Sequence, residues 1–150
     1  ARASLVQQLG GDAIVVDGEN LADRVAQATD GAPIQLALDA VGGAATQKLA
    51  RCIAPGGTVV SYGALSRKPS HLGVDQSVFR DITLRGFWLF RWNQEHGQTT
   101  ADNLVSDLAE QTSQGNLTSR IDSEYPLEDI LNAIERTRSP DCFGRVIIRP

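Results

Sequence analysis

Three short loops of the sequence each follow a predicted buried strand and place glycine or apolar residues at the strand's end. They are Ala40-Val41-Gly42-Gly43, Tyr62-Gly63-Ala64-Leu65 and Phe87-Trp88-Leu89. Residues of these types let a flat ring and its ribose approach backbone N–H and C=O groups closely. Because ligands of open parallel sheets bind at the carboxyl ends of the strands, the pattern favours a nucleotide-like ligand.

Each loop taken alone is equally consistent with an ordinary tight turn, since glycine is the usual turn residue. Three such loops in succession make the ligand interpretation stronger than the turn interpretation. Asp39, at the end of one strand, has two candidate roles: it either orients a ribose or caps the turn that follows.

The remaining residues that could do chemistry do not form a recognisable metal-binding or catalytic pattern. Cys52 and Cys142 lack the paired Cys/His spacing of a zinc site, so neither a structural metal nor a disulfide framework is indicated. His71 and His96 stand alone in polar stretches, and we expect both to be solvent-exposed. We therefore assign no metal ligand and no catalytic residue, and we expect a reducing, cytoplasmic location.

A glycine-rich phosphate loop of the GxGxxG type is absent from the sequence, although a dinucleotide site needs one. The glycine pairs at positions 10–11, 42–43 and 56–57 lack the third glycine, and the first and last follow predicted helices. The sequence also opens in a helical pattern without an initiator Met. We expect the phosphate cradle to lie before Ala1, so that residues 1–150 form a partial nucleotide-binding domain with a C-terminal tail.

The elements that position these loops alternate between strand-like and helix-like segments, which predicts a parallel sheet flanked by helices. Strands are predicted at 13–16, 35–39, 58–61 and 82–86, and helices up to Leu9, from Leu21 to near Asp30, and around Ala45 to Ile53. A helix at 102–114, a weak strand at 118–125, a helix from Pro126 and a last strand at 144–149 follow. The looser stretch 62–81 is predicted to be a long loop with a helical turn near 76–79.

Composition excludes several other classes of protein. The chain has 150 residues, of which 41% are hydrophobic, which suits a single globular domain. No apolar run approaches the ~20 residues of a membrane span. The net charge is -4 and the charges are interspersed, so no basic face for nucleic acid is expected.

A family resemblance rests on three stretches of sequence. They are Leu38-Asp39-Ala40-Val41-Gly42-Gly43, the run from Gly56 to Gly63, and the run from Phe79 to Leu89 followed by Trp92. These stretches resemble the zinc-independent medium-chain dehydrogenase/reductases, most of all the NADPH-dependent 2-enoyl thioester reductases and next the quinone oxidoreductases. The Arg-Gly-Phe-Trp-Leu cluster is the most discriminating feature. The resemblance covers nearly the whole chain but only the second part of such an enzyme.

The resemblance implies an α/β fold, Rossmann-like, that lacks its first strand and glycine-rich loop and ends in a helix–strand tail. It implies NADP(H) as cofactor, with Tyr62, Gly63, Ala64 and Leu65 along the nicotinamide and the backbone of Phe87, Trp88 and Leu89 at the carboxamide. Val41 and Gly42 complete the crevice. Arg145 falls where the family has a basic cofactor contact, usually lysine; the charge is kept while its geometry changes.

The resemblance further implies a small-molecule substrate, a homodimer, and a catalytic tyrosine in a preceding domain that matches neither Tyr62 nor Tyr125. A quinone reductase and a non-catalytic binding or dimerisation module remain as alternatives. The aromatic residues Phe87, Trp88, Phe90 and Trp92 also have a second interpretation, as core or dimer contacts.

Overall fold

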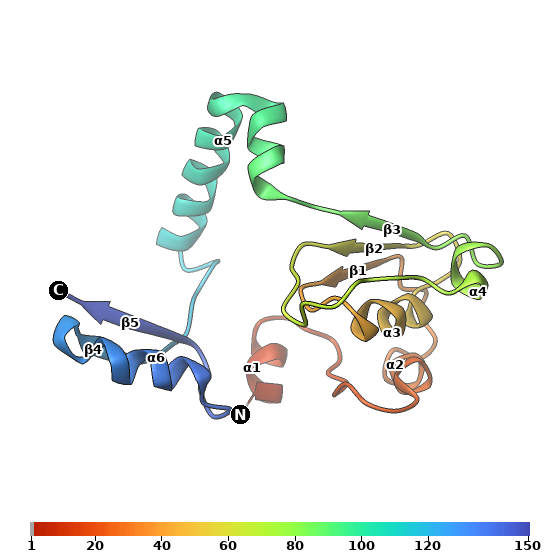
Figure 1. The fold of residues 1–150 in the computed structure, drawn as a ribbon, viewed down its shortest axis with the longest axis horizontal. Helices are drawn as coiled ribbons and strands as arrows, with labels where there is room; N and C mark the ends of the chain where they lie inside the picture. Colours follow the sequence, from red (N-terminus) through yellow and green to blue (C-terminus); the bar gives the residue numbers. More distant parts are fainter. Residues whose placement is uncertain (1) are drawn as a thin grey trace. The chain divides into compact units, whose positions relative to one another are not determined.

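The computed structural model describes residues 2–150, which divide into two compact units at Trp92 and Asn93. Figure 1 shows the elements along the chain. The first unit holds α1 (Arg2–Gln8), α2 (Leu21–Ala28), β1 (Leu36–Asp39), α3 (Ala44–Cys52), β2 (Thr58–Ser61), α4 (Val74–Ser77) and β3 (Thr83–Gly86). The second holds β4 (Ile121–Pro126), η1 (Leu127–Asp129), α6 (Ile130–Arg138) and β5 (Arg145–Arg149). The helical run α5 (Leu89–Ser113) spans the boundary.

The first unit is built on a parallel sheet of three strands in the order β1-β2-β3 (Figure 1). Helix α3 packs against β1 and β2, and α2 packs against α3. The α/β class with parallel strands and flanking helices is thereby confirmed, and the predicted strand 58–61 has the observed bounds of β2.

The core of this unit lies between α3 and the sheet. Ala50, Ile53, Val59 and Ile82 are buried together, with further aliphatic side chains packed against them. Burial of such residues supplies most of the favourable free energy of folding, at roughly 25 cal/mol per Å² of apolar surface. At the end of α3 the Arg80 guanidinium donates to the carbonyls of Ala50, Arg51 and Ile53. A cation at this position satisfies carbonyls that the helix leaves unpaired.

The predicted strand at 13–16 is wrong, because this segment is irregular in the structure. A strand exists only through its ladder of hydrogen bonds to a neighbour, and the sheet of the first unit contains β1, β2 and β3 alone among residues 2–92. Ile14 and Val16 are accordingly left exposed.

The predicted helix 102–114 matches the later part of the longer run α5, which ends one residue earlier, at Ser113. That run bends at Gly97, whose φ of 77° and ψ of 165° are not helical. Glycine takes this conformation without the steric cost that a Cβ imposes. The bend separates the aromatic start of α5 from the segment in which the sequence predicted the helix.

The second unit pairs β4 with β5 in parallel, and α6 packs against both strands. The predicted strand–helix–strand order of the C-terminal tail is confirmed, with Pro126 immediately before η1. None of the helices in residues 2–150 combines the length and the apolar character that crossing a membrane demands.

Candidate functional site

The three predicted loops leave the sheet at the same edge. In the parallel register Asp39 lies opposite Ser61, and Ser61 lies opposite Gly86. These three residues are the last of their strands. The loops that begin at Ala40, Tyr62 and Phe87 therefore start side by side at the carboxyl edge, which is where open parallel sheets bind their ligands.

The first two loops are joined by backbone hydrogen bonds. The Tyr62 amide donates to the Asp39 carbonyl at 2.9 Å, and the Leu65 amide donates to the Ala40 carbonyl at 3.2 Å. Gly63 packs so closely that an alanine methyl there would lie 2.7 Å from the Ala40 oxygen. Gly63 is therefore required because the backbone of the first loop lies too close to it for a side chain. The sequence pattern had instead suggested that glycine allows a ligand to approach the backbone here.

The third loop presents its aromatic residues to solvent within the described chain. Its first amide, that of Phe87, continues the ladder by donating to the Ser61 carbonyl at 2.9 Å. Phe87, Trp88 and Leu89 are all exposed, and the Trp88 ring lies 5.3 Å from the ring of Phe90. These rings are thus not part of the core of the first unit.

Asp39 caps the turn at the end of β1. The side chain is 1% exposed, and its Oδ1 accepts the amides of Val41 at 2.9 Å and Gly42 at 3.0 Å. Its Oδ2 accepts the Thr46 hydroxyl at 2.6 Å. Burial opposes ionisation, but the three donors outweigh it and hold the pKa of Asp39 below its usual range. Of the two roles open to Asp39, the structure supports the capping role.

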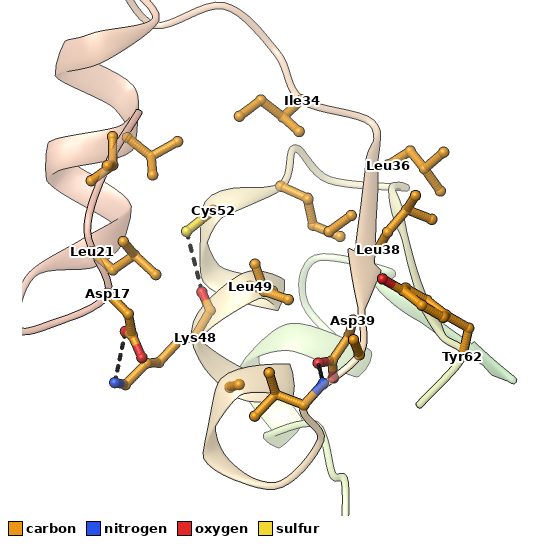
Figure 2. A pocket seen from close by; sticks show the side chains of 17 residues that line it. Asp17, Leu21, Ile34, Leu36, Leu38, Asp39, Lys48, Leu49, Cys52 and Tyr62 are labelled. Atoms are coloured by element: carbon orange, nitrogen blue, oxygen red, sulfur yellow. Dashed lines mark hydrogen bonds and ion pairs between the residues drawn. The ribbon is translucent and has the colours of Figure 1, made fainter. Parts of the chain in front are cut away.

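A pocket of about 540 Å³ lies beside β1, between α2 and α3 (Figure 2). Its wall includes Leu36 and Leu38, which are 56% and 63% exposed, and it reaches the loop edge at Val41 and Tyr62. Strands of parallel sheets are ordinarily covered on both faces. We therefore interpret the pocket as uncovered packing surface of β1.

Besides the Val41–Asp39 hydrogen bond, two polar contacts of side chains occur among the residues that line this pocket (Figure 2). Lys48 and Asp17 form an ion pair at 2.9 Å, which holds the pKa of Asp17 below its usual range. The Cys52 thiol donates to the Lys48 carbonyl at 3.3 Å, and burial raises the pKa of that thiol. A thiol with a raised pKa is a poor nucleophile at neutral pH.

Arg145 lies in the second unit, whereas the three loops belong to the first. It begins β5, is exposed, and its amide donates to the Arg120 carbonyl at 2.8 Å. Its predicted contact with a cofactor stays a prediction.

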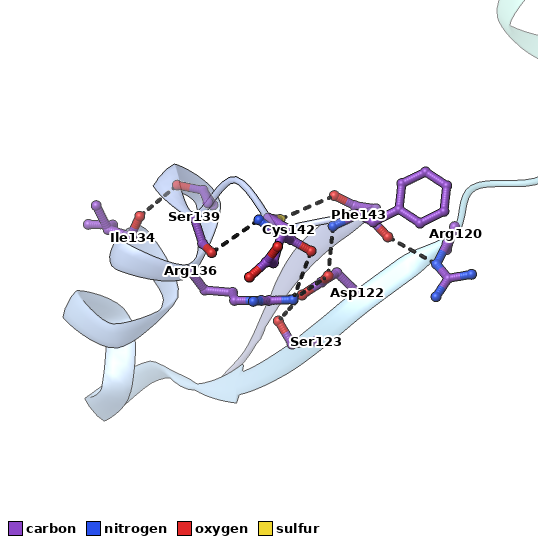
Figure 3. A network of polar contacts seen from close by, with 11 residues as sticks. Arg120, Asp122, Ser123, Ile134, Arg136, Ser139, Cys142 and Phe143 are labelled. Atoms are coloured by element: carbon purple, nitrogen blue, oxygen red, sulfur yellow. Dashed lines mark hydrogen bonds and ion pairs between the residues drawn. The ribbon is translucent and has the colours of Figure 1, made fainter. Parts of the chain in front are cut away.

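The polar centre of the second unit is Asp122 (Figure 3). Arg136 donates to both of its carboxylate oxygens, at 2.6 and 2.8 Å, and the Phe143 amide donates at 2.8 Å. The hydrogen-bonded Arg136 guanidinium holds the pKa of Asp122 well below its usual range. This network fixes the loop before β5 onto α6 and is structural.

Sequence reasoning missed Thr46 and Ser70, whose hydroxyl oxygens lie 2.9 Å apart beneath the loop edge. The only sequence signal for Thr46 is its place in the first turn of the helix that follows the glycine pair. Within residues 2–150, no three His, Cys, Asp or Glu side chains gather in a way that could hold a metal ion.

Comparison with known proteins gives relatives over most of the chain. Enoyl-[acyl-carrier-protein] reductase, mitochondrial, from Bos taurus is 39% identical over 114 residues, which are 76% of this chain and 31% of the relative. The enzyme of the same name from Rattus norvegicus is 34% identical over 136 residues, or 90% of this chain and 36% of the relative. The chain thus spans about a third of the length of the curated relatives it matches.

Solved structures share the fold. A complex of a protein with NADP and crotonyl-CoA matches 81% of this chain and 35% of its own, with a TM-score of 0.66 and 18% identity. A protein named as an NADPH:quinone reductase from Bacillus thuringiensis matches 97% of this chain and 45% of its own, with a TM-score of 0.77 and 23% identity. Residues 9–148 match the sequence profile described as zinc-binding dehydrogenase. The chain belongs to the zinc-binding dehydrogenase family.

Proposed function

We propose that this chain is the nicotinamide-binding part of an NADP(H)-dependent reductase of 2-enoyl thioesters. The observation that carries the proposal is its 39% identity over 114 residues to a protein named enoyl-[acyl-carrier-protein] reductase. The solved complex with NADP and crotonyl-CoA, itself a 2-enoyl thioester, is 18% identical and indicates that the two proteins share a fold. The quinone reductase alternative has support only from structures below 25% identity, which indicate the fold alone.

The residues proposed to contact the cofactor come from the three loops and from β5. They are Val41, Gly42, Tyr62, Gly63, Ala64, Leu65, Phe87, Trp88, Leu89 and Arg145. Because the first three strands end in register, nine of these ten residues surround one sheet edge. No residue of the chain is proposed to bind the pyrophosphate, since the sequence has no GxGxxG loop.

The loop edge fits a nicotinamide in two respects. The exposed faces of Tyr62, Leu65 and Phe87 offer apolar surface for a flat ring. Leu89 begins α5, and the first amides of a helix have no intrahelical acceptor. The Leu89 amide is therefore available to donate to a carboxamide oxygen, as the family resemblance implies.

When bound, NADPH supplies the hydride that adds to the β-carbon of the enoyl thioester. The proposed task of this chain is to hold and orient the ring through backbone groups and to shield it from water with apolar side chains. We assign no proton donor to it. Tyr62 serves as surface for the ring, and Tyr125 lies in β4 of the second unit. The family name refers to zinc, but the described residues offer no ligand cluster for it, so no step of the proposal uses a metal.

The proposed partners are a small-molecule substrate and a second copy of the protein. Strand β3 is an edge strand of the first sheet within the described residues, so its outer side is open for pairing. A cytoplasmic location stays a prediction; the enoyl reductases it resembles are named as mitochondrial.

The test is a fluorescence titration of the full-length protein with NADPH, with NADH as the control ligand, followed by a turnover assay with crotonyl-CoA. We expect saturable NADPH binding and oxidation of NADPH only when crotonyl-CoA is present. Absence of saturable binding would favour the non-catalytic module. NADPH oxidation with a quinone in place of the thioester would move the assignment to the quinone reductases.

A further inference from the structure

A chain of hydrogen bonds, buried at Asp39 and Thr46 and half-buried at Ser70, connects the first loop to the segment that follows the second loop. It begins at the Val41 and Gly42 amides, which donate to Asp39 Oδ1 at 2.9 and 3.0 Å. It continues through Asp39 Oδ2 to the Thr46 hydroxyl at 2.6 Å. It ends at the Ser70 hydroxyl, whose oxygen lies 2.9 Å from that of Thr46. Asp39 and Thr46 are 1% and 0% exposed.

The direction of these bonds follows from the number of protons. A threonine hydroxyl has one proton, and the short contact with the carboxylate takes it. Ser70 must therefore donate its own proton to Thr46. Each member of the chain has a partner, and because Asp39 and Thr46 are buried, this network holds one geometry firmly.

The segment that contains Ser70 lies directly over the glycine turn. A methyl group at Gly42 would lie 3.2 Å from Ser70 Oγ, and one at Gly43 would lie 3.1 Å from both Ser66 Oγ and Lys68 Cβ. The Ser66 amide also donates to the Val41 carbonyl at 2.8 Å. Segment 66–70 is thus tied to the turn after β1 by backbone at one end and by the chain of hydrogen bonds at the other.

We propose that Thr46 and Ser70 are positioning residues for cofactor binding, which fix the Val41–Gly42 turn against the Tyr62–Leu65 loop through Asp39. This inference rests on the proposed function, since it names what holds the nicotinamide-binding loops in place. Neither hydroxyl lies among the residues proposed to contact the cofactor. The two hydroxyls act by setting the separation of the two loops. Their loss should therefore weaken NADPH binding and leave the hydride-transfer step unchanged.

The experiment compares Thr46→Val, which keeps the shape and removes both hydrogen bonds, with Thr46→Ser, which restores the hydroxyl. Ser70→Ala breaks only the outer bond and leaves the Asp39–Thr46 contact intact, so it serves if Thr46→Val fails to fold. Ile53→Val is the matched control. It removes one methyl group from the core and lowers stability, but it leaves the chain of hydrogen bonds intact. NADPH dissociation constants, kcat at saturating NADPH, and amide hydrogen exchange of the unliganded protein are measured for each full-length variant.

For Thr46→Val we expect an NADPH Kd about tenfold higher, and for Ser70→Ala about threefold higher. Thr46→Ser and Ile53→Val should bind like the unsubstituted protein, and kcat should stay unchanged throughout. Amide exchange at Val41 and Gly42 should accelerate in Thr46→Val alone.

Two outcomes distinguish a failure of this inference from a failure of the proposed function on which it rests. If the unsubstituted protein shows no saturable NADPH binding, the proposed function fails and the positioning role fails with it. If the unsubstituted protein binds NADPH and neither Thr46→Val nor Ser70→Ala changes the Kd, only the positioning role is overturned. An equal rise in Kd for Ile53→Val would also overturn it, because the effect would then follow stability in general.

Discussion

Gly63→Ala should force apart the two loops that meet at the carboxyl edge of the sheet. The added methyl would lie 2.7 Å from the Ala40 carbonyl oxygen and 3.1 Å from Ala40 Cα. Both are backbone atoms, so neither can rotate away as a side chain would. The strain therefore falls on the hydrogen bonds that Tyr62 and Leu65 donate to Asp39 and Ala40.

The expected loss of stability follows from these contacts. Overpacking that shifts backbone costs about 1–3 kcal/mol. Weakening one of the two loop hydrogen bonds adds about 0.5–1.5 kcal/mol. Alanine also restricts the unfolded chain, which offsets about 0.4–1 kcal/mol. The net loss is about 2 kcal/mol, and with a urea dependence of about 2 kcal/mol per M the unfolding midpoint should fall by about 1 M.

The assay is urea unfolding followed by far-UV circular dichroism, with Gly86→Ala as the control. Gly86 ends the neighbouring strand, and a methyl there meets no atom within 4 Å. Gly86→Ala should leave the midpoint unchanged or raise it slightly. Equal midpoints for Gly63→Ala and the unsubstituted protein, or an equal loss in both variants, would refute the reasoning from close backbone approach.

Four further substitutions test other contacts of the structure. The folded-state pKa of Asp39 is lowered, so its contribution to stability is full above about pH 4 and is lost as the pH falls through the folded pKa. The stability gap between the unsubstituted protein and Asp39→Asn should therefore shrink below pH 4 in urea titrations; a constant gap would contradict this. Arg136→Lys replaces a two-bond contact with a point charge and should destabilise the second unit, measured as faster amide hydrogen exchange of residues 93–150 in the full chain. Ile53→Ala should cost about 2–5 kcal/mol in urea unfolding, because the side chain is buried. Leu65→Ala, at an exposed position, should cost less than about 0.5 kcal/mol, and a larger loss there would show that Leu65 is covered.

Local patterns were enough to predict most of the elements. The apolar runs that became β1, β2 and β3 are short and bounded by glycine or proline, so each is recognisable without its neighbours. The three glycine and apolar loops were also visible, since residue type alone indicates where backbone can be approached closely. Family membership followed from the same stretches and is confirmed by the match over residues 9–148.

Non-local contacts explain what the patterns could not predict. The segment 13–16 has the alternation of a strand, yet a strand needs a neighbour, and the sheet of the first unit provides none for it. Likewise the helical run begins at Leu89, well before the predicted helix 102–114, and continues across a bend at Gly97.

The sequence by itself determined the α/β class, the order of the elements and the candidate loops, because each depends on residues close together along the chain. Only the tertiary structure decided that the strands end in register, and so that the loops share an edge. It also decided that Asp39 holds a turn through Thr46 and Ser70, the latter 24 residues beyond Thr46. The physical reason is that strand register and buried hydrogen bonds join residues far apart in sequence. The spacing of residues along the chain does not reveal which of them come into contact.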